Sequence, residues 1–352
     1  MEAASLLVLS FLALALAIRI AFQSAHEIRM RIRSPRAIDQ RGFIEIGGIG
    51  QWLTLRGEDR DNPVLLILHG GPGAALSAVA FALFRGLEKH FTVVHWDQRG
   101  AGRTFGHNGR HRSGEISITR MTQDGIEVAE HLCARLGKPN IALCAISWGS
   151  VLALGMIRAR PDLFAAYVGT GQIVDMLGGE RFAYRTLLTR AREGGQKTAI
   201  SALELIGPPP FGSGKTRRIW QQWLLDFAPA SERRAMREIP FLLITAPRTS
   251  LRDVWDTIAG VFFSYSKLFR SLMEYRAEPY GWTFRVPMYF FQGSDDLQTP
   301  TKLVRDFVRQ IRAPKKALIA LEGGGHLVIR SMGPEFVREL VSRLKPTRLS
   351  LP

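Results

Sequence analysis

The sequence predicts an α/β fold: a mostly parallel sheet flanked by helices, with an inserted helical segment and an apolar helix at the N-terminus. Continuous apolar runs such as 63–71 and 140–146 are typical of buried parallel strands. Amphipathic helical segments alternate with these runs, which favours a parallel sheet covered on both faces. The alternation breaks between 172 and 284, where the sequence is helical in character and rich in Arg and Trp.

This pattern divides the 352-residue chain into three parts. We expect a hydrophobic anchor and basic linker over 1–41, a core made of 42–171 and 285–352, and a helical cap over 172–284. The composition, 46% hydrophobic and 22% charged, is that of an ordinary globular protein and suits one large α/β domain with an insertion.

The N-terminal segment 5–22 is the predicted membrane contact. Residues 5–18 carry no charge, and the apolar run continues to Phe22 if Arg19 extends to the bilayer interface, which gives about the 20 residues that a span requires. From the arginines that follow, we expect the part of the chain after this segment to lie on the cytoplasmic face. We expect an uncleaved anchor. The alternatives are a secretory signal, whose removal leaves a secreted or periplasmic protein, and a soluble protein whose first helix packs on itself.

Charge and cysteine usage exclude several classes of function. The net charge is +16, from 47 Lys and Arg against 31 Asp and Glu, but the basic residues are scattered and form no nucleic-acid-binding signature. Cys133 and Cys144 are interpreted as core thiols. No Cys/His cluster has metal-ligand spacing, so we expect no metal and no cofactor. From the scattered basic residues we also expect no nucleic-acid partner. The oligomeric state is not predicted.

The elements of the core follow in order from their patterns. Alternating apolar positions over 42–57 predict a hairpin that turns through Gly47–Gly48. Continuous apolar runs predict further strands, and helical periodicity predicts the helices between them. The strands are expected at 63–71, 91–100, 140–146, 164–171, 286–296 and 315–326, and the helices at 118–137, 147–161, 301–311 and 334–344.

Ser147 lies where a predicted strand ends and a helix begins, in the sequence CAISWGS. Small residues at 145 and 149 permit the sharp turn that exposes a nucleophilic hydroxyl. A serine hydroxyl also needs a base to take its proton and a carboxylate to orient that base.

The chain order selects the base. At such a strand-to-helix turn the triad order is Ser, then Asp or Glu, then His, and of eight histidines only His326 follows Ser147. It ends the sequence GGGH after a predicted strand; a surface-loop histidine is the alternative. Asp296, in GSDDLQTP at the carboxyl end of the preceding strand, is the predicted acid. Its neighbour Asp295 is the alternative, since one of the two could cap the next helix.

Two further strand ends complete the predicted site. HGGPG (69–73) lets the backbone approach a substrate closely, so we assign the oxyanion hole to the N–H groups of Trp148 and Gly71, with Gly70 as a near alternative. A simple tight turn is the other interpretation of HGGPG. In DQRGAGR, we interpret Asp97 and Arg99 as part of an ion pair that stabilises the loop. Contact with a substrate is the alternative.

These motifs together resemble the proline iminopeptidase (prolyl aminopeptidase) branch of the α/β-hydrolase superfamily. The resemblance covers roughly residues 40–346 and rests on HGGPG, DQRGAGRT, the Ser-Trp-Gly-Ser turn, G-x-x-D-x-x-T-P and GGH. It implies an α/β-hydrolase fold with a cap. The chain departs from the peptidases at Ala145–Ile146, where they commonly carry two glycines, and in its N-terminal anchor.

The resemblance also implies a reaction, the release of N-terminal proline or another small residue from peptides. In the family, acidic residues of the cap hold the free α-amine. The candidates here are Glu180, Glu204 and Asp175, and each is also consistent with a solvated carboxylate. The expected substrate is a small peptide or a small ester or amide. The alternative functions are an esterase or lactonase with the same triad, and a non-catalytic ligand receptor on a hydrolase scaffold.

Overall fold

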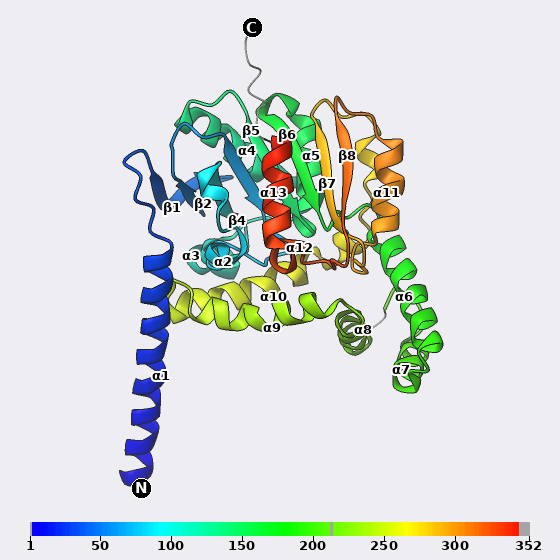
Figure 1. The fold of residues 1–352 in the computed structure, drawn as a ribbon, viewed down its shortest axis with the longest axis horizontal. Coiled ribbons are helices and arrows are strands. Elements are labelled where there is room, and N and C mark those ends of the chain that lie inside the picture. Colours follow the sequence, from blue (N-terminus) through cyan, green and yellow to red (C-terminus); the bar gives the residue numbers. More distant parts are fainter. Residues whose placement is uncertain (1, 212–213, 345–352) are drawn as a thin grey trace.

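The computed structural model describes residues 2–211 and 214–344. A central sheet carries helices on both faces, and a layer of helices crosses one end of it (Figure 1). Helix α1 (Glu2–Arg29) extends away from the rest of the molecule. Residue 1 of the predicted anchor and 345–352 of the predicted core lie outside the described residues.

The sheet has the order β1-β2-β4-β3-β5-β6-β7-β8. Only the pairings β1–β2 and β2–β4 are antiparallel among the described strands, so the predicted mostly parallel sheet is confirmed. The strands are β1 (Ile38–Ile46), β2 (Ile49–Gly57), β3 (Val64–Leu68), β4 (Thr92–Asp97), β5 (Ile141–Ile146), β6 (Phe164–Thr170), β7 (Met288–Gly293) and β8 (Lys316–Leu321).

The predicted hairpin is also confirmed. Ile46 of β1 pairs with Ile49 of β2, which leaves Gly47 and Gly48 as a two-residue turn. Both glycines have positive φ, 57° and 74°, as a tight turn between twisted strands requires.

Two hydrophobic clusters cover the two faces of the sheet. Leu66 and Leu68 of β3 point into the cluster that contains α4 (Ile118–Leu136), α5 (Trp148–Ala159) and α11 (Thr301–Gln310). Leu65 and Ile67 point into the cluster on the other face. That second cluster includes residues of α2 (Ala80–Leu83), α12 (Val328–Ser331) and α13 (Gly333–Leu344). Burial on both faces explains why the central strands are continuous apolar runs.

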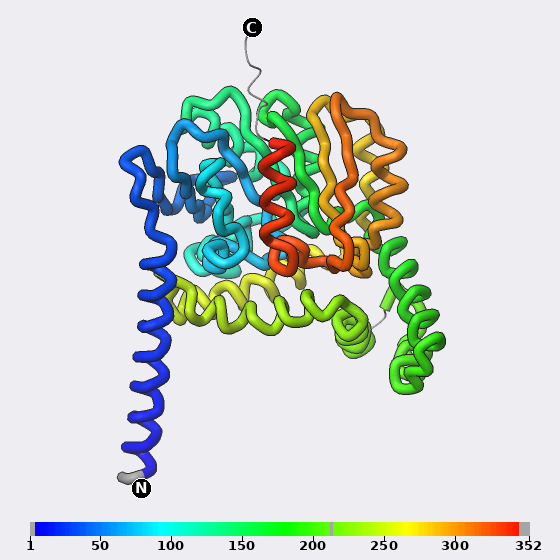
Figure 2. Tube along the Cα trace, in the orientation of Figure 1, coloured from blue at the N-terminus to red at the C-terminus, as the bar shows by residue number. Residues whose placement is uncertain are grey.

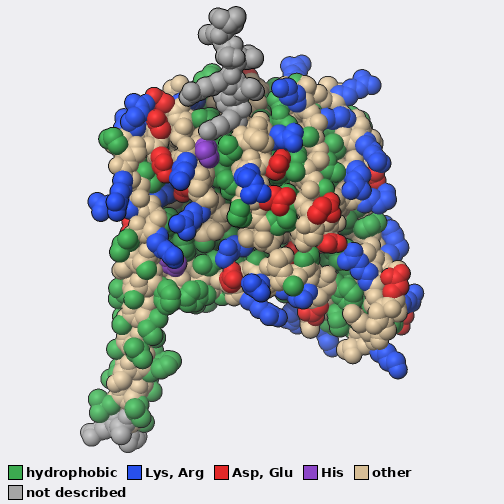
Figure 3. Space-filling model, in the orientation of Figure 1, with side chains coloured by type: hydrophobic (Ala, Val, Ile, Leu, Met, Phe, Trp, Pro, Cys, Tyr) green, Lys and Arg blue, Asp and Glu red, His purple; other side chains and the backbone are tan. Residues whose placement is uncertain are grey.

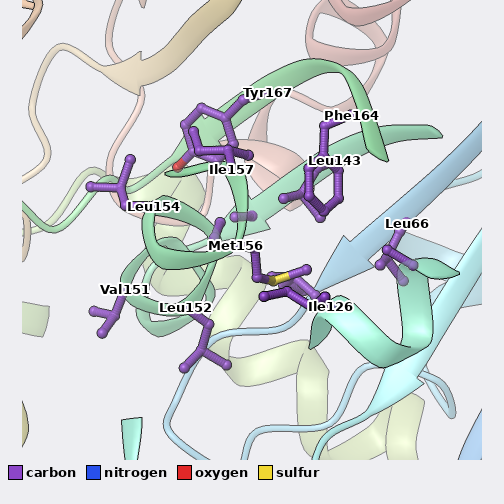
Figure 4. Packing of buried hydrophobic residues seen from close by; sticks show 14 of the residues in the cluster. Leu66, Ile126, Leu143, Val151, Leu152, Leu154, Met156, Ile157, Phe164 and Tyr167 are labelled. Carbon is purple, nitrogen blue, oxygen red and sulfur yellow. The ribbon is translucent and has the colours of Figure 1, made fainter. Parts of the chain in front are cut away.

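Helix α5 is buried within the first cluster. Figure 4 shows its side chains Val151, Leu154 and Met156 among residues of the neighbouring strands and of α4. The helix directly after Ser147 is therefore held by packing along its length, which fixes the position of the turn before it.

The segment between β6 and β7, which we call the cap, is helical. Figure 2 traces it leaving the sheet after β6 and returning at β7. Its helices are α6 (Met176–Glu193), α7 (Lys197–Ile206), α8 (Gly214–Asp226), α9 (Ala230–Ile244) and α10 (Leu251–Met273). Helices α9 and α10 lie across the end of the core beside α3 (Gly102–Arg112).

Helix α1 is long and apolar enough to cross a membrane, and by length and composition it also fits a signal sequence. Its large hydrophobic side chains from Leu6 to Ile20 are about half exposed or more. Near its C-terminal end it contacts the cap: Arg19 and Gln23 donate hydrogen bonds to backbone carbonyls at the end of α9 and in the loop between α9 and α10. Arg19 therefore has protein acceptors at the point where the apolar run is interrupted.

The turn between β5 and α5 is strained. Ser147 has φ 50° and ψ −117°, in a region that residues with a Cβ rarely adopt. An added Cβ on Gly149 would lie 2.5 Å from the carbonyl oxygen of Leu68, so the turn requires glycine at 149. The predicted sharp turn with a small residue at 149 is confirmed.

We expect Ser147→Gly to be more stable than Ser147→Ala by about 1 kcal/mol, because glycine adopts positive φ without strain while alanine retains it. The free energies of unfolding of the two variants would be compared by chemical denaturation in the same detergent. Both variants lack the hydroxyl, so the comparison isolates the backbone. Equal stability, or a less stable glycine variant, would show that the turn carries no strain.

Candidate active site

His326 and Asp296 form a buried hydrogen-bonded pair. Asp296 follows β7, His326 follows β8, and because these strands are parallel neighbours their carboxyl ends lie side by side. Asp296 Oδ2 lies 2.9 Å from His326 Nδ1, and both side chains are almost completely buried. The sequence-predicted base and acid are thus in direct contact.

The Asp296 carboxylate is held by its own loop. Oδ1 accepts the backbone N–H groups of Gln298 and Thr299 at 2.8 and 2.9 Å, and Oδ2 accepts the Thr299 hydroxyl at 2.7 Å. These donors fix the direction of the carboxylate. Asp295, the alternative acid, is half exposed and lies 3.7 Å from Arg190, so it contacts a surface cation in place of the imidazole.

Ser147 lies next to this pair. Its N–H donates to the carbonyl of Thr170 at 2.9 Å, which holds the serine against the end of β6. The next residue, Gly171, faces the imidazole: an added Cβ there would lie 2.7 Å from His326 Cε1. Gly171 also has φ +57°, so both its conformation and its surroundings require glycine. Gly171, which no motif in the sequence singles out, thus links the segment that holds Ser147 to the imidazole of His326.

A second carboxylate, Glu232 of α9, reaches the loop of His326 from the cap. It is 1% exposed, and its Oε2 accepts the backbone N–H of His326 at 2.5 Å. An added Cβ on Gly325 would lie only 1.7 Å from the same oxygen, so the glycine before His326 makes room for it. Burial raises the pKa of Glu232 above its usual value. The sequence analysis missed Glu232 because nothing in its local pattern distinguishes it from a surface acid on an amphipathic helix.

The electrostatics of His326 reflect opposing effects. Burial lowers the pKa of an imidazole, but the carboxylates of Asp296 and Glu232 stabilise the imidazolium, and their combined effect is larger. The pKa of His326 is therefore raised above 6.5. A raised pKa strengthens the imidazole as a base, provided that the solution pH keeps it neutral.

Residues 69–71, the loop after β3, lie beside the serine. An added Cβ on Gly70 would lie 3.3 Å from Ser147 Cβ, and Gly71 has φ +119°, which only glycine adopts readily. Trp148 is the first residue of α5, so its N–H has no acceptor within the helix. The predicted oxyanion donors, Gly71 and Trp148, thus come from segments that flank the Ser147 side chain.

A buried hydrogen-bond network joins the loops after β3, β4 and β5. The Gln98 side chain accepts from the indole Nε1 of Trp148 at 3.0 Å and donates to the carbonyl of His69 at 3.1 Å. His69 Nδ1 donates to the carbonyl of Gly70 at 2.8 Å, and its Nε2 accepts from the backbone N–H of Gln98 at 3.2 Å. Burial lowers the pKa of His69 to about 4, consistent with a neutral imidazole in these two roles. The network holds the glycine loop against the start of α5.

Arg99 forms a buried ion pair as predicted, but its partner is Asp124 of α4 and not Asp97. Arg99 forms two hydrogen bonds with the carboxylate of Asp124, of 2.7 and 3.0 Å, and both side chains are buried. Asp97 has a different role: its carboxylate accepts the N–H of Arg103 at 2.9 Å, and burial raises the pKa of Asp97 to about 6. These contacts tie the end of β4 and the loop after it to α4 and to the start of α3.

The predicted cap acids are engaged elsewhere in the cap. Glu180 is buried in an ion pair with Arg217 of α8. Glu204 is half exposed and forms a 2.8 Å ion pair with Arg192, and Asp175 caps α6 by accepting the N–H of Gly178 at 2.8 Å. The structure therefore does not bring these three carboxylates into contact with the Asp296–His326 pair, whereas it does bring Glu232. The residues the structure describes contain no group of three or more His, Cys, Asp or Glu side chains that could hold a metal ion.

The chain resembles known proteins over most of its length. Residues 64–340 match the alpha/beta hydrolase family. A Bacillus subtilis (strain 168) protein described as probable aminopeptidase YbaC is 31% identical over 287 residues, which cover 80% of this chain and 89% of that protein.

Solved structures share the fold. A proline iminopeptidase-related protein from Thermus thermophilus superposes with a TM-score of 0.61 at 19% identity, covering 87% of this chain and 97% of that one. A membrane phospholipase A, described as a novel bacterial virulence factor, gives a TM-score of 0.58 at 16% identity, covering 97% of this chain and 99% of that one.

The resemblance seen in the motifs is in line with these matches, which include relatives described as an aminopeptidase and as proline iminopeptidases. The family match spans more than half of the chain, and the Bacillus subtilis relative aligns with most of it. The chain belongs to the alpha/beta hydrolase family.

Proposed function

We propose that the protein is a serine aminopeptidase of the proline iminopeptidase type, with Ser147 as nucleophile, His326 as general base and Asp296 as the orienting acid. The observation that carries this proposal is the buried Asp296–His326 hydrogen bond beside the strained turn at Ser147. The position of Glu232 and the aminopeptidase name of the Bacillus subtilis relative favour a peptide substrate.

In the proposed reaction, Ser147 Oγ attacks the carbonyl carbon of the N-terminal residue. His326 Nδ1 is engaged by Asp296, which leaves Nε2 to accept the serine proton. The N–H groups of Trp148 and Gly71, with Gly70 as the neighbouring alternative, stabilise the negative oxygen of the tetrahedral intermediate. The imidazolium then protonates the leaving amine, and water hydrolyses the acyl-enzyme by the same route.

Glu232 is the proposed acceptor of the substrate's α-amine. Its Oε2 accepts the backbone N–H of His326, its Oε1 lies 3.4 Å from Gln298 Nε2, and the carboxylate also has a backbone hydrogen bond from Leu327. A carboxylate in this position, next to the base and on a cap helix, can pair with an ammonium group on the α-carbon adjacent to the attacked carbonyl. Glu180 and Glu204 stay as more distant candidates for substrate contacts within the cap.

An esterase acting on a non-peptide substrate is the second candidate. The same triad and oxyanion donors hydrolyse esters, and the exposed apolar helix α1 favours a substrate found at a membrane. The membrane phospholipase A that shares the fold over nearly the full chain is in line with this alternative. A non-catalytic ligand receptor would not require the strained serine or the buried Asp–His pair.

We further propose that α1 is an uncleaved anchor with the catalytic domain on the cytoplasmic side. Arg19 and Gln23 donate to carbonyls at the end of α9 and in the loop between α9 and α10, and Glu27 forms an ion pair with Arg248 of the same loop. Cleavage after the apolar segment would remove some of these contacts. The secreted or periplasmic alternative requires that the cap be stable without them.

The two candidate functions are separated by a matched pair of substrates, proline-β-naphthylamide and a short acyl p-nitrophenyl ester. We expect release of naphthylamine by the full chain, and a loss of roughly 10³-fold or more in the Ser147→Ala variant, since removal of the nucleophile leaves only the oxyanion site and binding. Turnover of the ester alone would replace the peptidase with an esterase. Unchanged turnover of either substrate by Ser147→Ala would exclude the mechanism.

Glu232→Gln tests the role of the second carboxylate. The amide oxygen can still accept the N–H of His326, but the charge is lost, so the pKa of His326 falls. Because the imidazole must be neutral to act as base, the acid limb of kcat/KM for the ester then moves to lower pH. For proline-β-naphthylamide we expect KM to rise roughly 10- to 100-fold, the usual effect of losing a charged hydrogen bond.

Glu238→Gln is the matched control, since Glu238 lies on the same helix and pairs with Arg330 at the surface. It should alter neither the pH profile nor KM. A Glu232→Gln variant with an unshifted acid limb, or with equal changes in KM for the amide and the ester, would exclude the proposed role of Glu232.

A further inference from the structure

Helix α10 carries an exposed row of large apolar side chains. Leu251, Trp255, Ile258 and Phe262 are 60%, 68%, 43% and 70% exposed. Their spacing of four, three and four residues places them on one face of the helix, over a length of about 16 Å. An apolar row of this kind on a surface helix marks an interaction site.

The opposite face of α10 packs on the loops that surround the site. Ser264 Oγ donates to the carbonyl of Gly100 at 2.8 Å, and an added Cβ on Gly73 would lie 2.7 Å from the carbonyl oxygen of Gly260. Gly260 lies two residues after Ile258 and two before Phe262, on the other side of the helix. The exposed row, which we call the α10 stripe, therefore points away from the core.

The apolar surface continues from the stripe towards α1. At the end of α9, Phe241 and Ile244 are 50% and 45% exposed. Phe22 of α1 packs edge-on against Phe241, with ring centroids 5.1 Å apart, and Arg19 donates to the carbonyl of Ile244 at 3.0 Å. Figure 3 shows hydrophobic side chains along α1 and at the corner where it meets the cap.

The orientation of α1 indicates what covers this surface. In Figure 1, α9 and α10 run roughly perpendicular to α1 and end beside it, and the N-terminal part of α1 extends beyond them on the side away from the core. From Ala4 to Phe22 the helix spans about 27 Å at 1.5 Å per residue, close to the ~30 Å hydrocarbon thickness of a bilayer. If α1 crosses the membrane, one bilayer surface therefore lies near Phe22, at the level of the cap.

The side chains around the stripe suit a lipid headgroup region. Trp255, Phe241 and Phe262 are aromatic residues of the kind that gather at membrane interfaces. Arg252, 79% exposed, neighbours the stripe on α10, and Arg237 is exposed on α9. With the net charge of +16, these arginines favour anionic headgroups.

We propose that the α10 stripe lies in the headgroup–acyl boundary of an anionic bilayer, so that the cap rests on the membrane surface beside the α1 anchor. The inference depends on the proposed anchoring by α1 and not on the catalytic assignments. Helix α10 then contacts lipid on one face and the loops after β3 and β4 on the other. An amphipathic helix lying in the interface plane is a known mode of membrane contact.

Fluorescence quenching by brominated lipid tests the position of Trp255. The full chain would be reconstituted into vesicles of phosphatidylglycerol and phosphatidylcholine, with and without phosphatidylcholine brominated near the top of its acyl chains. We expect a quenched component of the tryptophan emission in the unchanged protein, lost in Trp255→Phe. Trp282→Phe is the matched control, because Trp282 is also exposed but precedes β7, at the opposite end of the strands from Ser147 and His326. It should keep the quenched component.

Equal quenching in the unchanged protein and in Trp255→Phe would overturn the inference. Alkaline carbonate extraction separates failure of the stripe contact from failure of the α1 anchor. A chain that stays in the vesicles during extraction but lacks Trp255 quenching disproves the stripe contact alone. An extractable chain without quenching disproves both. An unquenched stripe accompanied by cross-linked dimers would show that a second copy of the chain covers it. Because the readout needs no turnover, an inactive protein with Trp255 quenching would support the stripe and contradict only the proposed reaction.

Discussion

The buried hydrogen bond between Asp296 and His326 is the interaction on which the rest of the site depends. It engages Nδ1 of the imidazole, which leaves Nε2 for the serine in the reaction we propose, and it offsets part of the cost of burying an imidazolium. The Asp296 carboxylate is itself held by two backbone N–H groups and a hydroxyl of its own loop. Glu232 adds a second negative charge from the cap, so the position of α9 and the pKa of His326 are physically linked.

The parallel sheet makes this arrangement possible because it collects loops from separate strands at one edge. Gln98, after β4, bonds both His69, after β3, and the Trp148 indole at the start of α5. Each loop is thus held by its neighbours as well as by its own backbone. This support allows the strained conformation of Ser147 to persist, since strain at one residue is stable only where the surrounding structure determines it.

The core and the Asp–His pair could be predicted from the sequence, because they follow from local pattern and chain order. Continuous apolar runs identify buried strands, and His326 is selected because no other histidine follows Ser147. Glu232 could not be predicted, since its contact with His326 depends on how α9 packs over the core. The exposed side of α10 could not be predicted either, because it also depends on how a helix packs over the core. Only the fold shows that Gly260 and Ser264 face the core while Trp255 stays exposed.

The central claim, that Ser147 is a nucleophile activated by His326, is tested most directly by covalent labelling. The full chain would be treated with a fluorophosphonate and digested, and the modified peptide identified by mass spectrometry. The account predicts one adduct, on Ser147, whose formation slows strongly in a His326→Ala variant because the base is missing. No adduct, an adduct on another residue, or labelling of Ser147 at an unchanged rate without His326 would contradict it.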